Sequence, residues 1–178
     1  ANMYGFECAL KERRGACPEK SCIYPQVCPL LGLTHEHQLA LLKALRQVPG
    51  VRKVFISSGI RYDLVMADAE YGDEYLQELV NYHVSGQLKL APEHSQPAVL
   101  RRMRKPSVQS LLAFKERFDA LSKAAGKKQF LTYYLIAAYP GCTQEDMFAL
   151  KHFASEKLDV LPEQVQIFTP TPSTYASL

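Results

Sequence analysis

The fold of this chain is decided by the stretch 129–141, which reads QFLTYYLIAAYPG. Residues 129–138 are rich in aromatic, β-branched and other apolar side chains, which favour an extended backbone. The run is closed by Pro140 and Gly141, a dipeptide that turns the chain. We therefore predict a strand over 129–138 that ends in a tight turn.

On both sides of this stretch, segments with a helical period alternate with short apolar runs. Three further segments are predicted to be strands: 53–57, 87–91 and 165–168. Five segments are predicted to be helices: 34–48, 73–83, 97–103, 107–125 and 143–158. This alternation indicates parallel strands joined by helical crossovers. The prediction is an α/β fold, either an open doubly wound sheet or part of a barrel of βα units.

The composition is that of an ordinary folded domain. The 178 residues carry a formal net charge of +3, and 47% of them are hydrophobic and 22% charged. These values exclude a disordered tail, a collagen-like fibre and a simple coiled coil. No apolar run approaches the roughly 18 residues that span a bilayer, and the N-terminus does not resemble a signal peptide, so we expect a cytoplasmic protein. The mild positive charge permits a nucleic-acid partner but does not argue for one.

The two ends of the chain look cut rather than natural. The chain begins at Ala1 instead of a methionine and stops at Leu178, just after a Pro-rich segment. We therefore expect it to be a piece of a longer protein.

Four of the five cysteines lie close together near the N-terminus: Cys8, Cys17, Cys22 and Cys28. They fall within 1–33, an irregular segment rich in Cys, Pro and Gly that precedes a βα-repeat part at 34–178. An odd number of cysteines without an export signal argues against a disulfide framework. Four thiolates in one short loop can bind zinc or an auxiliary iron–sulfur cluster, so these four are the candidate metal ligands. The alternative is that the thiols are buried as small apolar groups.

Ligands of parallel α/β folds bind at the carboxyl ends of the strands. Glu93 and His94 stand at one such end as an acid/base pair, and the alternative is that they cap the next helix. Most of the basic cluster at 101–105 is expected to be a solvated helix face, and Lys105 is its best placed member to reach back over the strand ends and bind a carboxylate or phosphate. Cys142 lies near a predicted helix start, where a thiolate would be favoured, although a lone cysteine is more often structural.

Several motifs, taken in order, resemble those of radical S-adenosylmethionine (SAM) enzymes. The segment 135–146, LIAAYPGCTQED, resembles the fifth-strand motif of that superfamily, in which an apolar strand precedes a Pro-Gly turn and an acidic helix start. The segments 88–94, LKLAPEH, and 99–106, VLRRMRKP, resemble its fourth-strand region, and 165–172 is similar to the sixth strand. Four short motifs look like those of the uncharacterised YgiQ-type radical SAM proteins: ANMYG at 1–5, SGIRYD at 58–63, LAPEH at 90–94 and QVQIF at 164–168.

The resemblance implies an α/β fold in the form of a partial TIM-like (βα) barrel fragment, with parallel strands and an irregular Cys-rich N-terminal segment. It also implies that eight residues contact SAM: Glu93, Lys105, Ile136, Tyr139, Pro140, Gly141, Phe168 and Thr169. Glu93 would contact the ribose or methionine part of SAM, and Lys105 would approach its carboxylate. The other six residues would flank the adenine.

The chemistry that the resemblance implies belongs to a parent protein. There, a [4Fe–4S] cluster fed by an electron donor would reduce SAM to methionine and a 5′-deoxyadenosyl radical, which abstracts hydrogen from a substrate of unknown class. The superfamily's cluster-binding C-x3-C-x2-C loop is absent from these residues, because the gaps between the N-terminal cysteines are eight, four and five. The chain is therefore expected to carry much of the SAM-contacting surface but not the cluster ligands.

Two other functions compete with this one. The first is a four-cysteine zinc module on an α/β scaffold that touches RNA through the basic residues 101–105. The second is an unrelated βα enzyme that uses Glu93 and His94 as acid and base.

Overall fold

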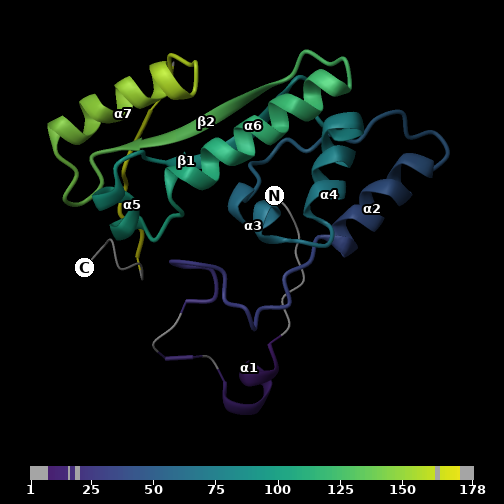
Figure 1. Ribbon diagram of the computed structural model, residues 1–178, viewed down its shortest axis with the longest axis horizontal. Coiled ribbons are helices and arrows are strands. Elements are labelled where there is room, and N and C mark those ends of the chain that lie inside the picture. The colour runs from purple at the N-terminus through teal and green to yellow at the C-terminus, as the bar shows by residue number, and fades with distance from the viewer. Residues whose placement is uncertain (1–7, 16, 19–20, 163–164, 173–178) are drawn as a thin grey trace.

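The computed structural model describes residues 8–15, 17–18, 21–162 and 165–172. Seven α-helices are present among them: α1 (Ala9–Arg14), α2 (Glu36–Gln47), α3 (Tyr62–Ala67), α4 (Gly72–Glu78), α5 (Pro97–Met103), α6 (Val108–Ala124) and α7 (Gln144–Lys157). A π-helical turn, η1 (Leu79–His83), continues α4. The strands in the described part are β1 (Gln87–Glu93), β2 (Phe130–Ala137) and β3 (Gln166–Ile167). Figure 1 shows their arrangement.

The three strands form one open parallel sheet in the order β1-β2-β3. Gln87 pairs with Phe130 at the start of the β1–β2 ladder, and Ile136 pairs with Gln166 in the β2–β3 ladder. An isolated parallel bridge from Ile60 to Leu90 places the segment before α3 along the other edge of β1. Helices alternate with these strands along the chain, so the predicted α/β class with parallel strands is confirmed.

The hydrophobic core lies between β1 and the helices α2, α3, α4 and α6. Helix α6 contributes Leu111, Phe114 and Phe118, all fully buried, which recur at helical spacing as an apolar stripe. They meet Leu88 and Leu90 of β1, which alternate with exposed residues as a strand with one buried face requires. Helix α7 lies along β2 (Figure 1), and Phe153 near its end packs against this core.

The predicted strand over 53–57 was wrong. These residues belong to no strand; the one backbone hydrogen bond recorded for them runs from the N–H of Ile56 to the carbonyl of His83, at 2.9 Å. A strand needs a neighbouring strand to satisfy its N–H and C=O groups, and the described part of the chain offers none here. Helices α1 and α3 were not predicted, whereas the five predicted helices are present within a few residues, the one over 73–83 as α4 and its π-helical continuation η1.

A buried, hydrogen-bonded pair of side chains, His35 and Asp68, ties the start of α2 to the turn between α3 and α4. One carboxylate oxygen of Asp68 accepts both the backbone N–H of His35 at 2.7 Å and its ring Nδ1 at 2.8 Å, and both side chains are almost fully buried. Burial lowers the pKa of His35 below its ordinary value of 6.5, although Asp68 opposes this effect. For Asp68, burial acts to raise the pKa, but hydrogen bonds from the N–H of Tyr71 and from His35 outweigh it and the pKa is lowered.

Helix α4 begins at a point of close backbone contact. A Cβ atom on Gly72 would lie 2.2 Å from the carbonyl oxygen of Val65 in α3. No real side chain tolerates that distance, so glycine permits the close approach of the two helices.

In its described residues, 8–15, 17–18 and 21–33, the Cys-rich segment is irregular, as predicted, apart from the short helix α1. It extends away from the sheet and the remaining helices (Figure 1). It is joined to the βα part by a hydrogen bond, in which the hydroxyl of Tyr24 donates to the carbonyl of Arg101 in α5 at 3.5 Å. Within the described ranges, no helix combines the length and apolar character needed to cross a membrane.

Candidate functional site

The carboxyl ends of β1, β2 and β3 meet at one edge of the sheet. Glu93 ends β1 and pairs in register with Leu135 of β2, and the N–H of Phe168, just after β3, donates to the carbonyl of Ala137 at 2.8 Å. These contacts place three of the predicted strand-end segments, around Glu93, Ala138 and Phe168, side by side. The predicted site residues on these segments are therefore neighbours in space.

Glu93 occupies a strained position made by an irregularity in the sheet. The register slips between Leu90 and Glu93, so that β1 carries one more residue than β2 over this span. Glu93 itself adopts a left-handed backbone conformation with φ of 67°, which non-glycine residues seldom adopt. Such strain persists where the surrounding structure holds it, and it is typical of functional sites.

Lys105 reaches back over the strand ends, as predicted. Arg104 ends α5 in a left-handed conformation, and the N–H of Lys105 donates to the carbonyl of Leu100 at 2.9 Å, which turns the chain back toward the sheet. The Lys105 ammonium then donates to Glu93 Oε1 at 2.9 Å and to the carbonyl of Ala91 at 3.4 Å.

The Glu93–Lys105 pair retains unused hydrogen-bonding capacity. Glu93 Oε2 is buried and has no hydrogen-bond partner among the described residues. An ammonium group has three N–H donors, and the described contacts of Lys105 use two of them. A buried carboxylate oxygen without a donor is costly, so this pair is suited to a ligand that carries both a donor and an acceptor.

The turn after β2 brings the predicted adenine-flanking residues together. The ring of Tyr139 meets that of Phe168 edge to face, with centroids 4.8 Å apart. Arg102 of α5 donates to the carbonyl of Gly141 at 2.9 Å, and the hydroxyl of Tyr139 donates back to the carbonyl of Arg102 at 3.3 Å. Gly141 has φ of 74°, and a Cβ atom there would lie 2.8 Å from the Arg102 guanidinium, so glycine is favoured at this turn.

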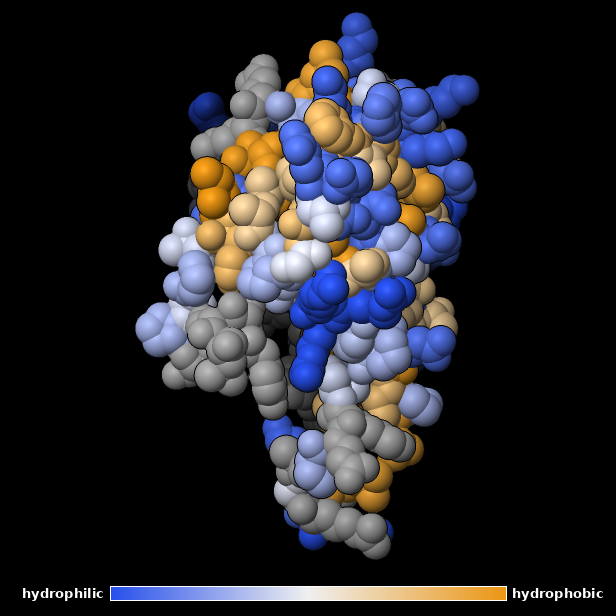
Figure 2. Space-filling model, turned by 90° about the vertical axis from the view of Figure 1, so that its left-hand side faces the viewer, coloured by the Kyte–Doolittle hydropathy of each residue, from blue (hydrophilic) through white to orange (hydrophobic). Residues whose placement is uncertain are grey.

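The remaining predicted contact residues take different places around this edge. Ile136 lies on β2 beside β3, whereas Pro140 and Thr169 are exposed on the segments that follow these strands. The α5 arginines Arg101 and Arg102 are exposed at the same end of the molecule. Figure 2 shows hydrophilic side chains gathered over the middle of this face.

The imidazole of His94 is buried and hydrogen-bonded, so it is not available as a general acid or base. Its Nδ1 accepts the N–H of Gln96 at 3.0 Å, so the proton of the neutral ring is on Nε2, which lies 3.5 Å from Cys142 Sγ. The ring is 1% exposed, and this burial lowers its pKa although Asp146 opposes the effect. His94 is thus a neutral, structurally engaged residue, which speaks against the reading of Glu93 and His94 as an acid/base pair.

Cys142 is held as a thiol. Burial raises the pKa of its side chain, and the charge of Asp146 raises it further, whereas the backbone at Ala138 and the charge of Arg102 act in the opposite direction. The expectation of a favoured thiolate near a helix start was therefore wrong, because burial and then the charge of Asp146 in the first turn of α7 raise the pKa of the thiol. The contact between Cys142 and His94 had no signal in the sequence, since the two lie on different strand ends.

The four N-terminal cysteines are not gathered into one site. Cys17 and Cys22 are exposed, Cys8 and Cys28 are half-buried, and all are free thiols. The N–H of Cys28 donates to the carbonyl of Cys22 at 2.8 Å, which is a loop hydrogen bond. In the ranges that the structure describes, no three His, Cys, Asp or Glu side chains are grouped as a metal site would require. The four-cysteine site stays a prediction, which metal analysis of the purified chain would test.

Comparison with known proteins gives a consistent group of relatives. No protein-family model matches the chain. The chain is similar over its whole length to a UPF0313 protein of Fusobacterium nucleatum, with 52% identity, and it covers 31% of that relative. UPF0313 proteins of Thermotoga neapolitana and Shewanella oneidensis are each 45% identical over 99% of the chain, which covers 31% and 22% of them. No solved structure matches. The chain thus spans about a third or less of the length of these relatives.

Proposed function

We propose that this chain, which is homologous to a segment of the uncharacterised UPF0313 proteins, is the SAM-binding part of a radical SAM iron–sulfur enzyme of the YgiQ type. The observation that carries the proposal is the Glu93–Lys105 pair at the carboxyl edge of the sheet, with its buried, unpaired carboxylate oxygen. The motif resemblance assigned both residues to SAM, and the structure brings them into direct contact.

The residues at this edge fit SAM in their chemistry. The amino-acid end of SAM carries an ammonium and a carboxylate, which match the free acceptor of Glu93 and the remaining donor of Lys105. Tyr139 and Phe168 supply an aromatic wall at the next strand ends, where the adenine ring would lie. The Glu93–Lys105 pair at the end of β1 and the aromatic pair after β2 and β3 thus offer polar and aromatic contacts along one edge of the sheet.

The residues of this chain would bind and orient SAM rather than transfer electrons. A reduced [4Fe–4S] cluster, when bound, supplies the electron that splits SAM into methionine and a 5′-deoxyadenosyl radical. The cluster ligands are expected outside these residues, because the C-x3-C-x2-C motif is absent from them. Glu93 would hold the polar end of SAM, and the Arg102–Gly141 hydrogen bond would fix the turn that carries Tyr139.

Equilibrium dialysis of the 178-residue chain with radiolabelled SAM tests the binding. We expect saturable binding that E93Q weakens at least tenfold, because the variant replaces a charged acceptor of the SAM ammonium. The matched control is E74Q, since Glu74 is also paired with a lysine, Lys43, but lies exposed on α4. Absence of saturable binding, or equal affinity of E93Q and E74Q, would refute the proposal.

A second experiment tests the chemistry of the parent protein. A full-length UPF0313 protein purified without oxygen should show broad iron–sulfur absorbance and, after reduction, release methionine and 5′-deoxyadenosine from SAM. A full-length sequence without a C-x3-C-x2-C motif would contradict the assignment.

A further inference from the structure

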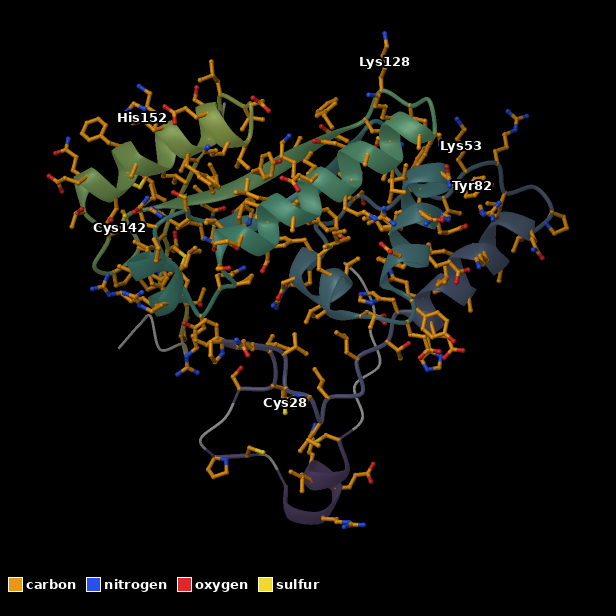
Figure 3. All side chains as sticks on the ribbon, in the orientation of Figure 1. Cys28, Lys53, Tyr82, Lys128, Cys142 and His152 are labelled. Carbon is orange, nitrogen blue, oxygen red and sulfur yellow. The ribbon has the colours of Figure 1, made fainter. Side chains whose placement is uncertain are left out.

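A second polar pocket lies at the opposite edge of the sheet. It is formed by Arg46 at the end of α2, the extended segment 51–55, the residues from η1 to the start of β1, and Lys127 after α6. Val84 and Ser85 precede β1, and Lys127 precedes β2, so the pocket lies at the amino ends of the strands. In Figure 3, Lys53 and Tyr82 mark this end, far from Cys142 at the candidate SAM site.

The charged residues that line this pocket are all positive. Arg46, Arg52, Lys53 and Lys127 line it, and none of its described lining residues is an aspartate or glutamate. Arg46 is partly neutralised, because it donates to Glu78 at 2.7 Å. Arg52 and Lys53 are exposed and form no ion pair with the described residues. The pocket therefore attracts anions.

The cation of Lys127 is fixed in place by neutral groups. Its ammonium donates to the carbonyl of Val80 at 3.2 Å and to that of Asn81, both in η1. Carbonyl oxygens orient an ammonium without cancelling its charge. The π-helical turn that supplies them is a rare element, frequent at functional sites.

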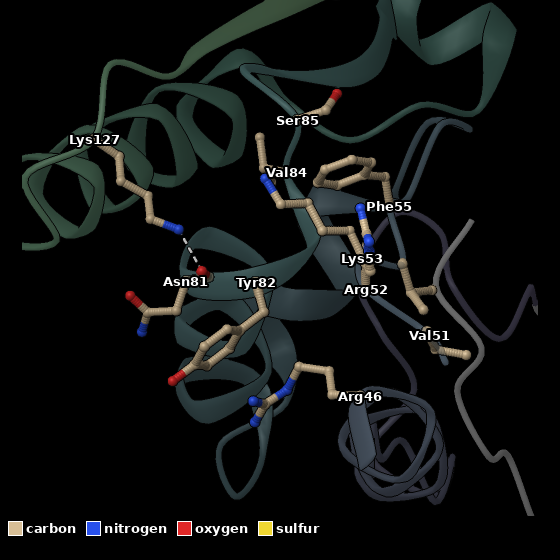
Figure 4. A pocket seen from close by; sticks show the side chains of 11 residues that line it. Arg46, Val51, Arg52, Lys53, Phe55, Asn81, Tyr82, Val84, Ser85 and Lys127 are labelled. Atoms are coloured by element: carbon tan, nitrogen blue, oxygen red, sulfur yellow. Dashed lines mark hydrogen bonds between the residues drawn. The ribbon is translucent and has the colours of Figure 1, made fainter. Parts of the chain in front are cut away.

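Two exposed aromatic rings lie beside the cations in this pocket. Phe55 is 45% exposed and Tyr82 is 48% exposed. The Arg46 guanidinium stacks on Tyr82, with Cζ 3.7 Å from the ring centroid, and the Lys53 ammonium lies 5.9 Å from the Phe55 ring. Figure 4 shows Tyr82 with Arg46 on one side of the pocket and Phe55 with Lys53 on another.

Cations interleaved with exposed aromatic rings are the surface on which nucleotides bind. Phosphates are drawn to the cations, and bases stack on aromatic rings and on guanidinium planes. The cavity has a volume of about 360 Å³, which is the size for one small ligand. We propose that this pocket binds a nucleoside phosphate, either free or as one unit of a single-stranded nucleic acid. The proposal is independent of the SAM site.

Fluorescence anisotropy of the chain with a labelled 12-residue oligouridylate tests this proposal. We expect R52Q/K53Q to weaken binding at least tenfold. The magnitude of the slope of log K against log salt should fall by about 1.4, because two phosphate contacts to a single strand are lost. The matched control is K151Q/K157Q, which removes two charges from exposed positions on α7. Equal weakening by both double variants would show a non-specific charge effect and overturn the proposal, as would absence of binding.

A second set of measurements tests the aromatic part and the source of the ligand. We expect Y82S to weaken binding at least fivefold, the effect of one base–aromatic stack, and Y82F to bind like the parent chain. Unlabelled UMP should displace the oligonucleotide far better than inorganic phosphate; equal competition would refute base recognition. Affinity for UMP close to that for the oligonucleotide would identify a free nucleotide as the ligand, and much weaker affinity would identify a single strand.

Discussion

Substituting Glu93 by Gln removes the charge that faces Lys105 while keeping the size of the side chain. The Glu93 and Lys105 side chains are 13% and 26% exposed, and the ammonium and carboxylate are 2.9 Å apart. A hydrogen bond between charged groups contributes about 1.5–3 kcal/mol net when shielded from water, and partial exposure of the lysine places this one at the lower end. We therefore expect a coupling free energy of about 1–2 kcal/mol between the two residues. The left-handed backbone conformation at position 93 destabilises the parent chain and E93Q by about the same free energy, so it does not contribute to the difference between them.

A double-mutant cycle measures this coupling. The parent chain, E93Q, K105M and the double variant are unfolded in urea, and the free energy of unfolding is obtained by linear extrapolation. The same cycle on Lys43 and Glu74, an ion pair whose side chains are 41% and 53% exposed, serves as the control and should give about 0.5 kcal/mol or less. A coupling at Glu93–Lys105 no larger than that of the control pair would refute the view that the strand ends hold a shielded, functional ion pair.

Three further perturbations follow from the packing and the helix ends. T143A should destabilise the chain by about 1 kcal/mol in urea, because the Thr143 hydroxyl caps α7 in a capping box with Asp146, and T143S should restore most of the loss. G72A should destabilise it by about 2 kcal/mol despite the better helix propensity of alanine, and a gain in stability would contradict the close contact between α3 and α4. Because folding lowers the pKa of both His35 and Asp68, the free energy of unfolding should fall as the pH drops from about 6.5 to below 4, and D68N should flatten the lower part of that slope.

Sequence patterns predicted the regular elements well where a local rule operates. The helices predicted over 107–125 and 143–158 are present as α6 and α7, because an apolar stripe in the first and a capping box at Thr143 in the second are encoded within a few residues. The strand expected at 53–57 failed because extended structure requires a partner, which local composition does not reveal. The same reason explains why the isolated bridge from Ile60 to Leu90 could not be predicted.

The candidate site was predicted in part, through motif resemblance and the rule on strand ends. That rule put Glu93 and the turn after β2 at one edge, and the helix junction suggested that Lys105 would reach it. The left-handed backbone at Glu93 and the contact between His94 and Cys142 depend on how β1 and β2 are aligned. Such pairings are set by tertiary packing, so no single segment of sequence contains them.

The parallel pairing of β1 with β2 also affects the risk of aggregation while the chain is being translated. The partner of Leu88 is Leu131, which a ribosome adds roughly 40 residues later, several seconds at typical rates of synthesis. During that interval β1 has no neighbouring strand to pair with, and its exposed backbone and apolar side chains can pair with other chains and aggregate. Lys89, exposed between the buried Leu88 and Leu90, places a charge in the middle of this edge. It is therefore well placed to protect the nascent strand from aggregation until β2 emerges.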